Sequence, residues 1–458
     1  MPKKKTALTI EERLQQALVS AEEQPYEVPE NWVWVRLGSL ADVKGGKRLP
    51  KGTTFSENIT KHPYIRVTDF NAIGVSLEGL KYIDEDVYEK ISRYTISSDD
   101  IYVSIAGSIG KVGIIPSCID GANLTENAAK ITNIKGINQK YLCLFLKSEF
   151  AQYQMQSATI ATTQAKLALF RIESLTFPLP PLSEQQRIVE RIEELFAKLD
   201  EAKERLQEVA DSFAVRKAAI LHKAFTGELT KQWRRENGVS DASWENVSLD
   251  SVCKSIYDGD HMPPPKSETG IPFLVISNVN TGFISFEKCR FVPEEYYDSL
   301  SETRTPEIGD ILYTIVGSYG IPVMVDTDKK FCFQRHMALL KPKDIYNRFL
   351  WRQLQTQSFF EQATSIATGT AQLTVPIKGL RKLLVKCPTL PEQHEIVRLI
   401  DDLLARERSA QQATEQALAS IDLMKKSILA RAFRGELGTN KASEASVLEL
   451  LKQVLAEC

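Results

Sequence analysis

The chain has 458 residues, and its 57 Lys and Arg against 59 Asp and Glu give a formal net charge of −2. Hydrophobic residues make up 43% and charged residues 25%, which is ordinary for a globular chain and excludes a polybasic tail protein, a disordered chain and a collagen. Apolar runs such as 311–316 are too short for a membrane-spanning helix, so we expect no membrane partner.

The first predicted element is an arm, residues 1–27, in which 10–21 form an amphipathic helix. Lysines at positions 3–5 precede no apolar segment, so we expect no signal peptide and a cytoplasmic protein. The tail, residues 441–458, is also amphipathic at 443–456. We expect the arm helix and the tail helix to lie close together.

Residues 28–182 form the first predicted globular domain, in which turn residues separate short β-rich runs. The runs 64–67, 100–105 and 112–115 predict strands, and 141–155 predicts a helix that closes the domain. A mixed α/β domain follows from this pattern.

A long helix with its linker, residues 183–242, comes next. Its apolar positions alternate in steps of four and three, the pattern of a coiled-coil seam. Ser183 and Gln186 fit a capping box at its start and Gly227 is placed to end it, which gives a rod of roughly 60 Å at about 1.5 Å per residue. The seam positions are Ile188, Ile192, Leu195, Leu199, Ala202, Leu206, Val209 and Phe213.

Residues 243–390 repeat the mixed pattern of the first globular domain. Strands are predicted at 273–276, 310–315 and 322–325, and a closing helix at 348–362. The second domain is therefore a diverged copy of the first.

A second long helix, residues 391–440, and then the tail complete the repeat. Segment 184–229 aligns without a gap on 392–437 with 17 identities in 46 positions, where unrelated segments give roughly 3. The second helix places Glu407 and Thr414 at two seam positions, so it needs a partner. The apolar seam positions that it keeps are Ile396, Ile400, Leu403, Ala410 and Ile421.

Thr389 and Glu392 can form the capping box of this second helix, with Pro391 in its first turn. An antiparallel pairing of the two long helices would bury both seams, and the alternative is two separate helices that lie on their own domains. The predicted fold class is α+β: two mixed α/β domains separated by two long antiparallel coiled-coil helices, with an internal pseudo-two-fold repeat.

Catalytic motifs are missing from the sequence. It has no G-x-x-x-x-G-K-[ST] phosphate loop, no G-x-G-x-x-G, no G-x-S-x-G, no H-E-x-x-H and no Asn/Asp-Pro-Pro-Tyr/Phe tetrad of a DNA adenine methyltransferase. None of the seven cysteines forms a C-x-x-C pair, so we expect reduced thiols without a zinc site. Asp258 and Asp260 could pair as metal ligands, but Asp-Gly-Asp is more typical of a turn. We expect no catalytic residue and no metal in this chain.

Three sets of motifs together resemble the specificity (S) subunit of type I restriction–modification systems, over about residues 26–440. They are L-x-E-Q-x-x-I-V-x-x-I at 182–192 and nearly so at 391–400, Ala-Phe-Thr-Gly-Glu-Leu at 224–229 with Ala-Phe-Arg-Gly-Glu-Leu at 432–437, and Tyr-Glu-Val-Pro-Glu-Asn-Trp-Val-Trp-Val-Arg-Leu at 26–37. The resemblance implies that each mixed domain is a target recognition domain that reads one half of a bipartite, asymmetric double-stranded DNA site.

The resemblance also implies that the two helices fix the spacer and bind two modification (methyltransferase) subunits of an adenine-specific complex, joined by two restriction (nuclease-translocase) subunits where a restriction activity is present. The chain itself would be non-catalytic, with S-adenosylmethionine, ATP and Mg²⁺ held by those partners. The alternatives are a recognition subunit of another phage-defence methyltransferase complex, and a coiled-coil scaffold without a DNA role.

Charge and loop composition indicate where DNA would bind. Residues 31–62 carry six Lys and Arg against two acids, a net +4, whereas 243–270 carry two against five, a net −3. The Gly45-Gly46 turn would let the backbone approach a phosphate or a groove. Hydroxyl and amide side chains in two repeated loops suit base edges, although they also dominate ordinary turns. The candidate DNA-binding residues are Lys44, Lys47, Arg48, Lys51, Thr68, Ser108, Lys111, Thr163, Gln164, Lys266, Ser277, Ser318, Tyr319, Thr370 and Gln372.

Phe225 and Phe433 stand beside the Gly-Glu-Leu segments that end the two long helices. They are candidate anchors for partner subunits or for the helix pair. The alternative is a place in the hydrophobic core, where phenylalanine is common.

Overall fold

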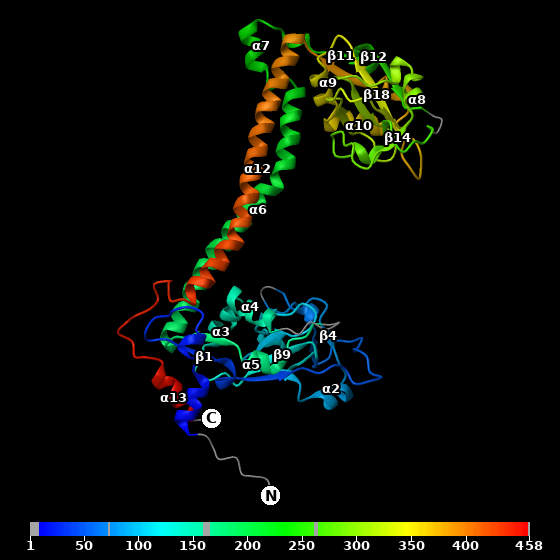
Figure 1. Ribbon diagram of the computed structural model, residues 1–458. Coiled ribbons are helices and arrows are strands. Elements are labelled where there is room, and N and C mark those ends of the chain that lie inside the picture. Colours follow the sequence, from blue (N-terminus) through cyan, green and yellow to red (C-terminus); the bar gives the residue numbers. More distant parts are fainter. Residues whose placement is uncertain (1–8, 72–73, 159–164, 261–263, 457–458) are drawn as a thin grey trace. The chain divides into compact units, whose positions relative to one another are not determined.

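The structure, a computed structural model, describes residues 9–71, 74–158, 165–260 and 264–456 (Figure 1). It consists of two compact units, residues 1–205 with 417–458, and residues 206–416. Each unit holds one mixed domain, called module 1 (residues 28–182) and module 2 (residues 243–390) below. Across the described residues, no helix combines the length and apolar character that a membrane crossing requires.

The described residues of module 1 form two four-stranded sheets and a two-stranded ribbon. Its strands are β1 (Val33–Arg36), β2 (Asp42–Gly45), β3 (Pro63–Ile65), β4 (Lys81–Tyr82), β5 (Thr95–Ile96), β6 (Ile101–Ser104), β7 (Val112–Gly113), β8 (Ala122–Leu124), β9 (Ala128–Thr132) and β10 (Thr176–Leu179). Its helices are α2 (Glu85–Ile91), α3 (Gln139–Leu146), α4 (Glu149–Ser157) and α5 (Leu169–Glu173), with 3-10 turns η2 (Leu37–Ser39), η3 (Val67–Asp69) and η4 (Ser117–Ile119). The antiparallel sheet has the order β2-β9-β6-β7, the mixed sheet has the order β4-β3-β8-β5 with β3 parallel to β8, and β1 pairs with β10.

Module 2 repeats this plan. Its strands are β11 (Glu245–Ser248), β12 (Cys253–Asp258), β13 (Ile271–Leu274), β14 (Arg290–Val292), β15 (Ile311–Thr314), β16 (Pro322–Met324), β17 (Cys332–Phe333), β18 (Met337–Pro342) and β19 (Leu384–Cys387). Its helices are α8 (Glu294–Asp298), α9 (Asn347–Leu354), α10 (Gln357–Ser365) and α11 (Ile377–Leu380), with 3-10 turns η6 (Leu249–Val252), η7 (Ile276–Asn278) and η8 (Glu302–Arg304). The orders are β12-β18-β15-β16, β14-β13-β17 with β13 parallel to β17, and β11-β19, so the predicted internal repeat of mixed domains is confirmed.

The predicted strands of both modules are present within a few residues of their expected limits. Each predicted closing helix, 141–155 and 348–362, is in fact two helices. The break falls at Ser148 and Thr356, whose hydroxyls accept hydrogen bonds from the N–H groups three residues on at 3.3 and 3.2 Å. These N-caps start a new helix, because a cap residue has a non-helical backbone.

The two long helices are α6 (Leu182–Phe225) and α12 (Leu390–Ala432), which pair side by side (Figure 1). In the first unit Lys203 pairs with Asp422 at 3.2 Å and Asp200 with Lys425, so residue numbers fall on α12 as they rise on α6. The antiparallel pairing predicted from the seams is therefore confirmed.

The seam differs from the predicted heptads in detail. Val209 is 40% exposed and Ala410 is exposed, although the heptad pattern places both in the seam. The two polar seam positions are accommodated: Glu407 binds Arg216 at 2.9 Å, and the buried Thr414 hydroxyl donates to the Ala410 carbonyl at 2.8 Å. A polar seam residue is tolerated here because its polar group has a partner.

Neither predicted capping box forms, although Thr389 directly precedes α12 and Pro391 lies in its first turn as predicted. Ser183 lies inside α6, and the Gln186 side chain bonds Asn138 and Glu190 instead of the helix start. The carboxylate of Glu392 likewise accepts from module side chains and not from the start of α12. The physical reason is that side chains in the first turns fasten each helix to a module.

The first turn of each long helix carries a buried glutamate whose carboxylate accepts a hydrogen bond from a tryptophan indole. Glu184 is fully buried and accepts from the Trp32 indole N–H at 2.8 Å. Glu392 is equally buried and accepts from the Trp244 indole at 3.0 Å and from Arg234 at 2.7 Å. The same contact in both copies fixes the direction in which each helix leaves its module.

The far end of each long helix docks in a module core. Phe433 is 1% exposed, with ring centroids 5.4 Å from Tyr141 and 5.1 Å from Phe145. Phe225 is 7% exposed and lies 5.2 Å from Phe349. Burial of each ring stabilises the docking by about 1.5–3 kcal/mol, and Phe225 also lines a surface hollow.

The arm and the tail meet in the first unit. They contain α1 (Ile10–Ala17), η1 (Ala21–Glu23) and α13 (Leu448–Ala456), and the Arg13 guanidinium donates to the Leu455 carbonyl at 2.9 Å. Their predicted proximity is confirmed. The linker after α6 forms α7 (Lys231–Asn237) and η5 (Asp241–Ser243).

Candidate nucleic-acid interface

Each module has a hollow at the same place in the repeat. Hollow 1, in module 1, encloses about 690 Å³, and hollow 2, in module 2, about 420 Å³. Their frames are equivalent, since Leu167 N–H donates to the Ile105 carbonyl at 2.9 Å and Val375 N–H donates to the Ile315 carbonyl at 2.8 Å. The repeat therefore builds two matching concave sites from the ends of matching strands.

A glycine lies beside each hollow because two backbone segments cross there. A Cβ on Gly46 would lie 2.1 Å from the Thr125 carbonyl oxygen, and one on Gly259 would lie 2.3 Å from the Phe333 carbonyl oxygen. The absence of a side chain at Gly46 thus allows close packing against the backbone of residues 124–125. The sequence suggested instead that this glycine allows a close approach to DNA.

Hollow 1 gathers two of the predicted DNA-binding residues around one acid. Lys47 and Arg48 line it with Lys166 and Glu126, and the Arg48 guanidinium lies 3.2 Å from the Glu126 carboxylate. A third predicted residue, Thr68, lines an adjoining hollow of about 410 Å³ with Arg48 and Glu126. Three cations against one carboxylate leave this surface positive, which suits phosphate oxygens.

Two more predicted residues lie on the turn after β6. Lys111 is exposed and its Nζ donates to the Phe70 carbonyl, next to η3, at 3.1 Å. Ser108 is exposed, and its carbonyl accepts from the Ser104 hydroxyl. This turn therefore stands close to the segment that carries Thr68.

The other predicted residues of module 1 are not brought into the hollows. Lys44 is exposed on β2 and pairs with Asp42 at 3.0 Å. Lys51 is exposed in a turn and lines neither hollow. Thr163 and Gln164 lie outside the described residues.

Hollow 2 has a different chemistry. Asp258, Arg335, His336 and Gln372 line it, and Gln372 is the predicted DNA-binding residue among them. Burial lowers the pKa of His336 and the charge of Arg335 lowers it further, which favours the neutral imidazole. This site offers a cation, a carboxylate, an amide and an imidazole to a ligand.

The remaining predicted residues of module 2 divide into two groups. Ser318 and Thr370 lie on turns next to Gln372, whereas Lys266 and Ser277 line no part of hollow 2. Tyr319 is used within the module, since its ring stacks on Phe360 at 5.4 Å and its hydroxyl donates to Thr364 at 3.1 Å.

Four hollow residues were missed by sequence reasoning: Glu126, Lys166, Arg335 and His336. A signal existed, because Glu126 and Arg335 stand 335 − 126 = 209 positions apart, close to the repeat offset, and each comes just before a paired central strand. Their charges are opposite, so the two positions share no identity in the repeat.

The structure offers no metal centre in its described part. Asp258 and Asp260 lie 3.9 and 4.0 Å from the Arg304 guanidinium, which offsets part of their negative charge. Within the described ranges, no group of three His, Cys, Asp or Glu side chains could hold a metal ion. The cysteines of those ranges are free, and burial raises the pKa of Cys253 and Cys332 to about 12.

Comparison with known proteins gives consistent results. Residues 29–211 and 242–418 match the family model of the type I restriction modification DNA specificity domain. The Escherichia coli type I restriction enzyme EcoBI specificity subunit is 26% identical over 455 residues, which covers 94% of this chain and 93% of that protein.

Two solved structures share the fold. The HsdS subunit from Thermoanaerobacter tengcongensis gives a TM-score of 0.63 at 21% identity, covering 91% of this chain and 100% of that one. A chain from a structure concerned with complex assembly and conformational transition of the type I R-M system gives 0.66 at 20% identity, covering 90% and 100%. The two-module architecture with paired long helices is thus a known fold.

Proposed function

The chain belongs to the family of type I restriction–modification DNA specificity domains, and on this premise we propose that it is the sequence-recognition subunit of a type I restriction–modification complex. Each module reads one half of a bipartite, asymmetric site in double-stranded DNA. The chain contributes no catalytic group to the complex.

One observation carries this proposal: the repeat preserves the frame of the hollow and changes its charges. Glu126 in hollow 1 and Arg335 in hollow 2 occupy equivalent positions before β9 and β18. A carboxylate accepts from cytosine N4, whereas Arg donates to guanine O6 and N7. Two modules with one frame and different charges suit two different half-sites.

The paired helices support the other part of the proposal. Antiparallel contacts such as Lys203–Asp422 and Arg216–Glu407 make each long helix part of a two-helix rod. Such a rod would fix the spacer between the half-sites and present faces for two modification subunits, with two restriction subunits in a complete system. S-adenosylmethionine, ATP and Mg²⁺ would act on those partners, in the cytoplasm.

The test uses the chain assembled with its modification subunits and a DNA that contains the full site. Replacing Lys47 and Lys166 by Ala should weaken binding and reduce the slope of log K against log salt by about 0.9 for each phosphate that is no longer neutralised. Lys61→Ala is the matched control, because Lys61 is exposed but pairs with Glu85 at 2.8 Å outside hollow 1. Equal salt slopes for the double variant and the control would contradict the placement of DNA at hollow 1.

A further inference from the structure

The two copies differ where the arm covers module 1. Val19 N–H donates to the Trp34 carbonyl at 3.0 Å, so the arm adds to the free edge of β1, and Trp34 is only 1% exposed. The equivalent strand of module 2 is β11, which pairs only with β19 among the described residues. Its Asn246, at the position of Trp34, is exposed.

The backbone of β11 is set up to take another strand. Leu249 N–H donates to the Leu383 carbonyl at 2.8 Å, which fixes that pair as a hydrogen-bonded one. Bonded and non-bonded pairs alternate along an antiparallel ladder. The pair of Asn246 with Lys386 is therefore non-bonded, and the N–H and C=O of Asn246 point away from β19.

The side chains beside this edge differ in the same way. In module 1 the Tyr26 ring of the arm lies 4.8 Å from Trp34 and 5.7 Å from Phe150. The Gln154 side chain hydrogen-bonds the backbone of Thr176 in module 1, and the Gln362 side chain hydrogen-bonds the backbone of Leu384 in module 2. These equivalent contacts set the residue offset between the two copies at 362 − 154 = 208.

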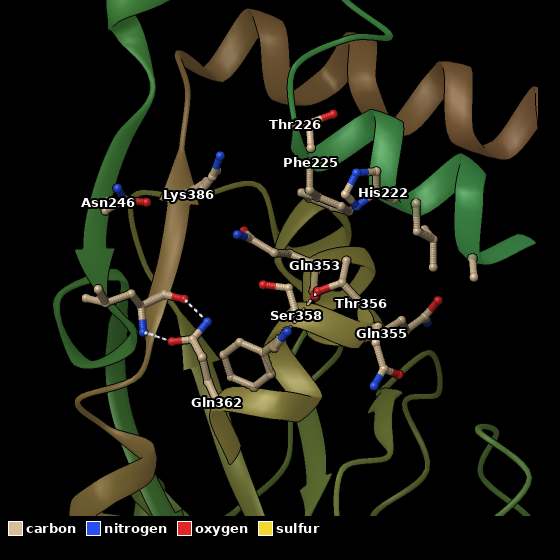
Figure 2. A pocket seen from close by; sticks show the side chains of 15 residues that line it. His222, Phe225, Thr226, Asn246, Gln353, Gln355, Thr356, Ser358, Gln362 and Lys386 are labelled. Atoms are coloured by element: carbon tan, nitrogen blue, oxygen red, sulfur yellow. Dashed lines mark hydrogen bonds between the residues drawn. The ribbon is translucent and has the colours of Figure 1, made fainter. Parts of the chain in front are cut away.

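By that offset Phe150 corresponds to Ser358 and Phe145 to Gln353. The aromatic side chains Phe150 and Phe145 of module 1 are thus replaced in module 2 by the smaller or polar side chains Ser358 and Gln353. The result is a hollow of about 440 Å³, hollow 3, between β11, β19, α10 and the end of α6 (Figure 2).

The described lining of hollow 3 combines apolar side chains with one cation, Lys386. Phe225 and His222 lie next to each other on α6, Lys386 lies across from them on β19, and the described lining includes no Asp or Glu (Figure 2). The arm segment that fills the equivalent place in module 1 carries Tyr26 with Glu22, Glu23 and Glu27 around it. An acidic segment with an aromatic side chain therefore fits the charge and the shape of the open site.

We propose that β11 and hollow 3 bind an extended, acidic segment of a modification subunit, which adds a strand at Asn246 and inserts an aromatic side chain beside Phe225. Strand addition supplies affinity through the main chain, and the hollow supplies selectivity. The inference rests on the proposed function, because it takes the modification subunit as the partner.

The experiment uses the full chain and measures the affinity of the modification subunit by titration. Asn246→Pro removes the outward N–H and leaves the ladder to β19 intact, and Ser358→Trp fills the hollow. Each should weaken binding at least about tenfold, which is about 1.4 kcal/mol. Glu361→Trp is the matched control on α10, since Glu361 is exposed and lies outside hollow 3. A photo-crosslinker at residue 358 should attach to a modification-subunit peptide that contains an aromatic and acidic residues.

Unchanged affinity of the Ser358→Trp variant would overturn the inference, and so would a crosslink only to DNA or to the arm of a second copy. Asn246→Pro is counted only if its circular dichroism spectrum matches that of the unchanged chain. Sequence-specific DNA binding by the assembled complex is measured in parallel. If the complex with the unchanged chain shows no sequence-specific DNA binding, the proposed function is contradicted. If that complex binds DNA and the Ser358→Trp variant binds the modification subunit with unchanged affinity, the inference alone is contradicted.

Discussion

At the scale of single residues, Gly46 gives the sharpest prediction. Gly46→Ala should destabilise the protein by about 1–3 kcal/mol or more, because its Cβ would lie 2.1 Å from a backbone oxygen that cannot move aside. Gly45→Ala is the matched control, since its Cβ would meet only the Leu169 side chain at 3.6 Å. Thermal unfolding measures both, and equal melting temperatures for the two variants would show that the segments can separate at no cost.

Single residues also show which members of the hollows could be predicted from the sequence. Lys47 and Arg48 were found because a run of cations is visible along the chain. Glu126 and Arg335 were not, because each acts through neighbours distant in sequence, such as Lys166 or Gln372. Charge along the chain predicts a surface, whereas the composition of a hollow needs the fold.

At the scale of elements, the buried contact at the start of α12 has a large expected effect. Glu392→Ala would leave Arg234, 7% exposed in its side chain, without the carboxylate that it binds at 2.7 Å. Removing one partner of a buried ion pair costs about 3–5 kcal/mol. Chemical denaturation should show a loss of that size.

The control for this variant is Glu395→Ala on the same helix. Glu395 pairs with Arg398, whose side chain is 58% exposed, so its removal should cost about 1 kcal/mol or less. Equal losses for the two variants would mean that the Glu392 cluster does not hold the helix.

The long helices allow a test of the spacer. One heptad inserted in both α6 and α12, after residues 205 and 416, lengthens each helix by about 10 Å and preserves the pairing. The spacer of the methylated site should grow by about three base pairs at about 3.4 Å each. An insertion in α6 alone breaks the register and should abolish methylation. A spacer of unchanged length in the double insertion would contradict the proposed role of the helices.

The seam shows why helix pairing was predictable and its details were not. Heptad spacing correctly indicated two paired helices. A straight helix has 3.6 residues per turn and drifts by about 20° per heptad against a 3.5-residue repeat. Val209 lies outside the seam and its neighbour Ala210 is less exposed, whereas the next predicted position, Phe213, is buried.

At the scale of the whole molecule, the duplication predicted the architecture, because segments as similar as 184–229 and 392–437 are expected to fold alike. The duplication did not predict that the arm covers only one copy. Tyr26 has no aromatic counterpart in the linker before β11, since the matching position there is Gly238. The proposed partner site at β11 therefore lies where the two copies differ.

Module exchange tests the central claim most directly. Module 1, residues 28–182, is replaced by that of a relative with a different site, and the methylated positions of a host genome are sequenced. The account predicts that one half of the bipartite site changes to that of the donor while the other half and the spacer stay the same. A change in both halves, or in neither, would contradict independent reading by the two modules.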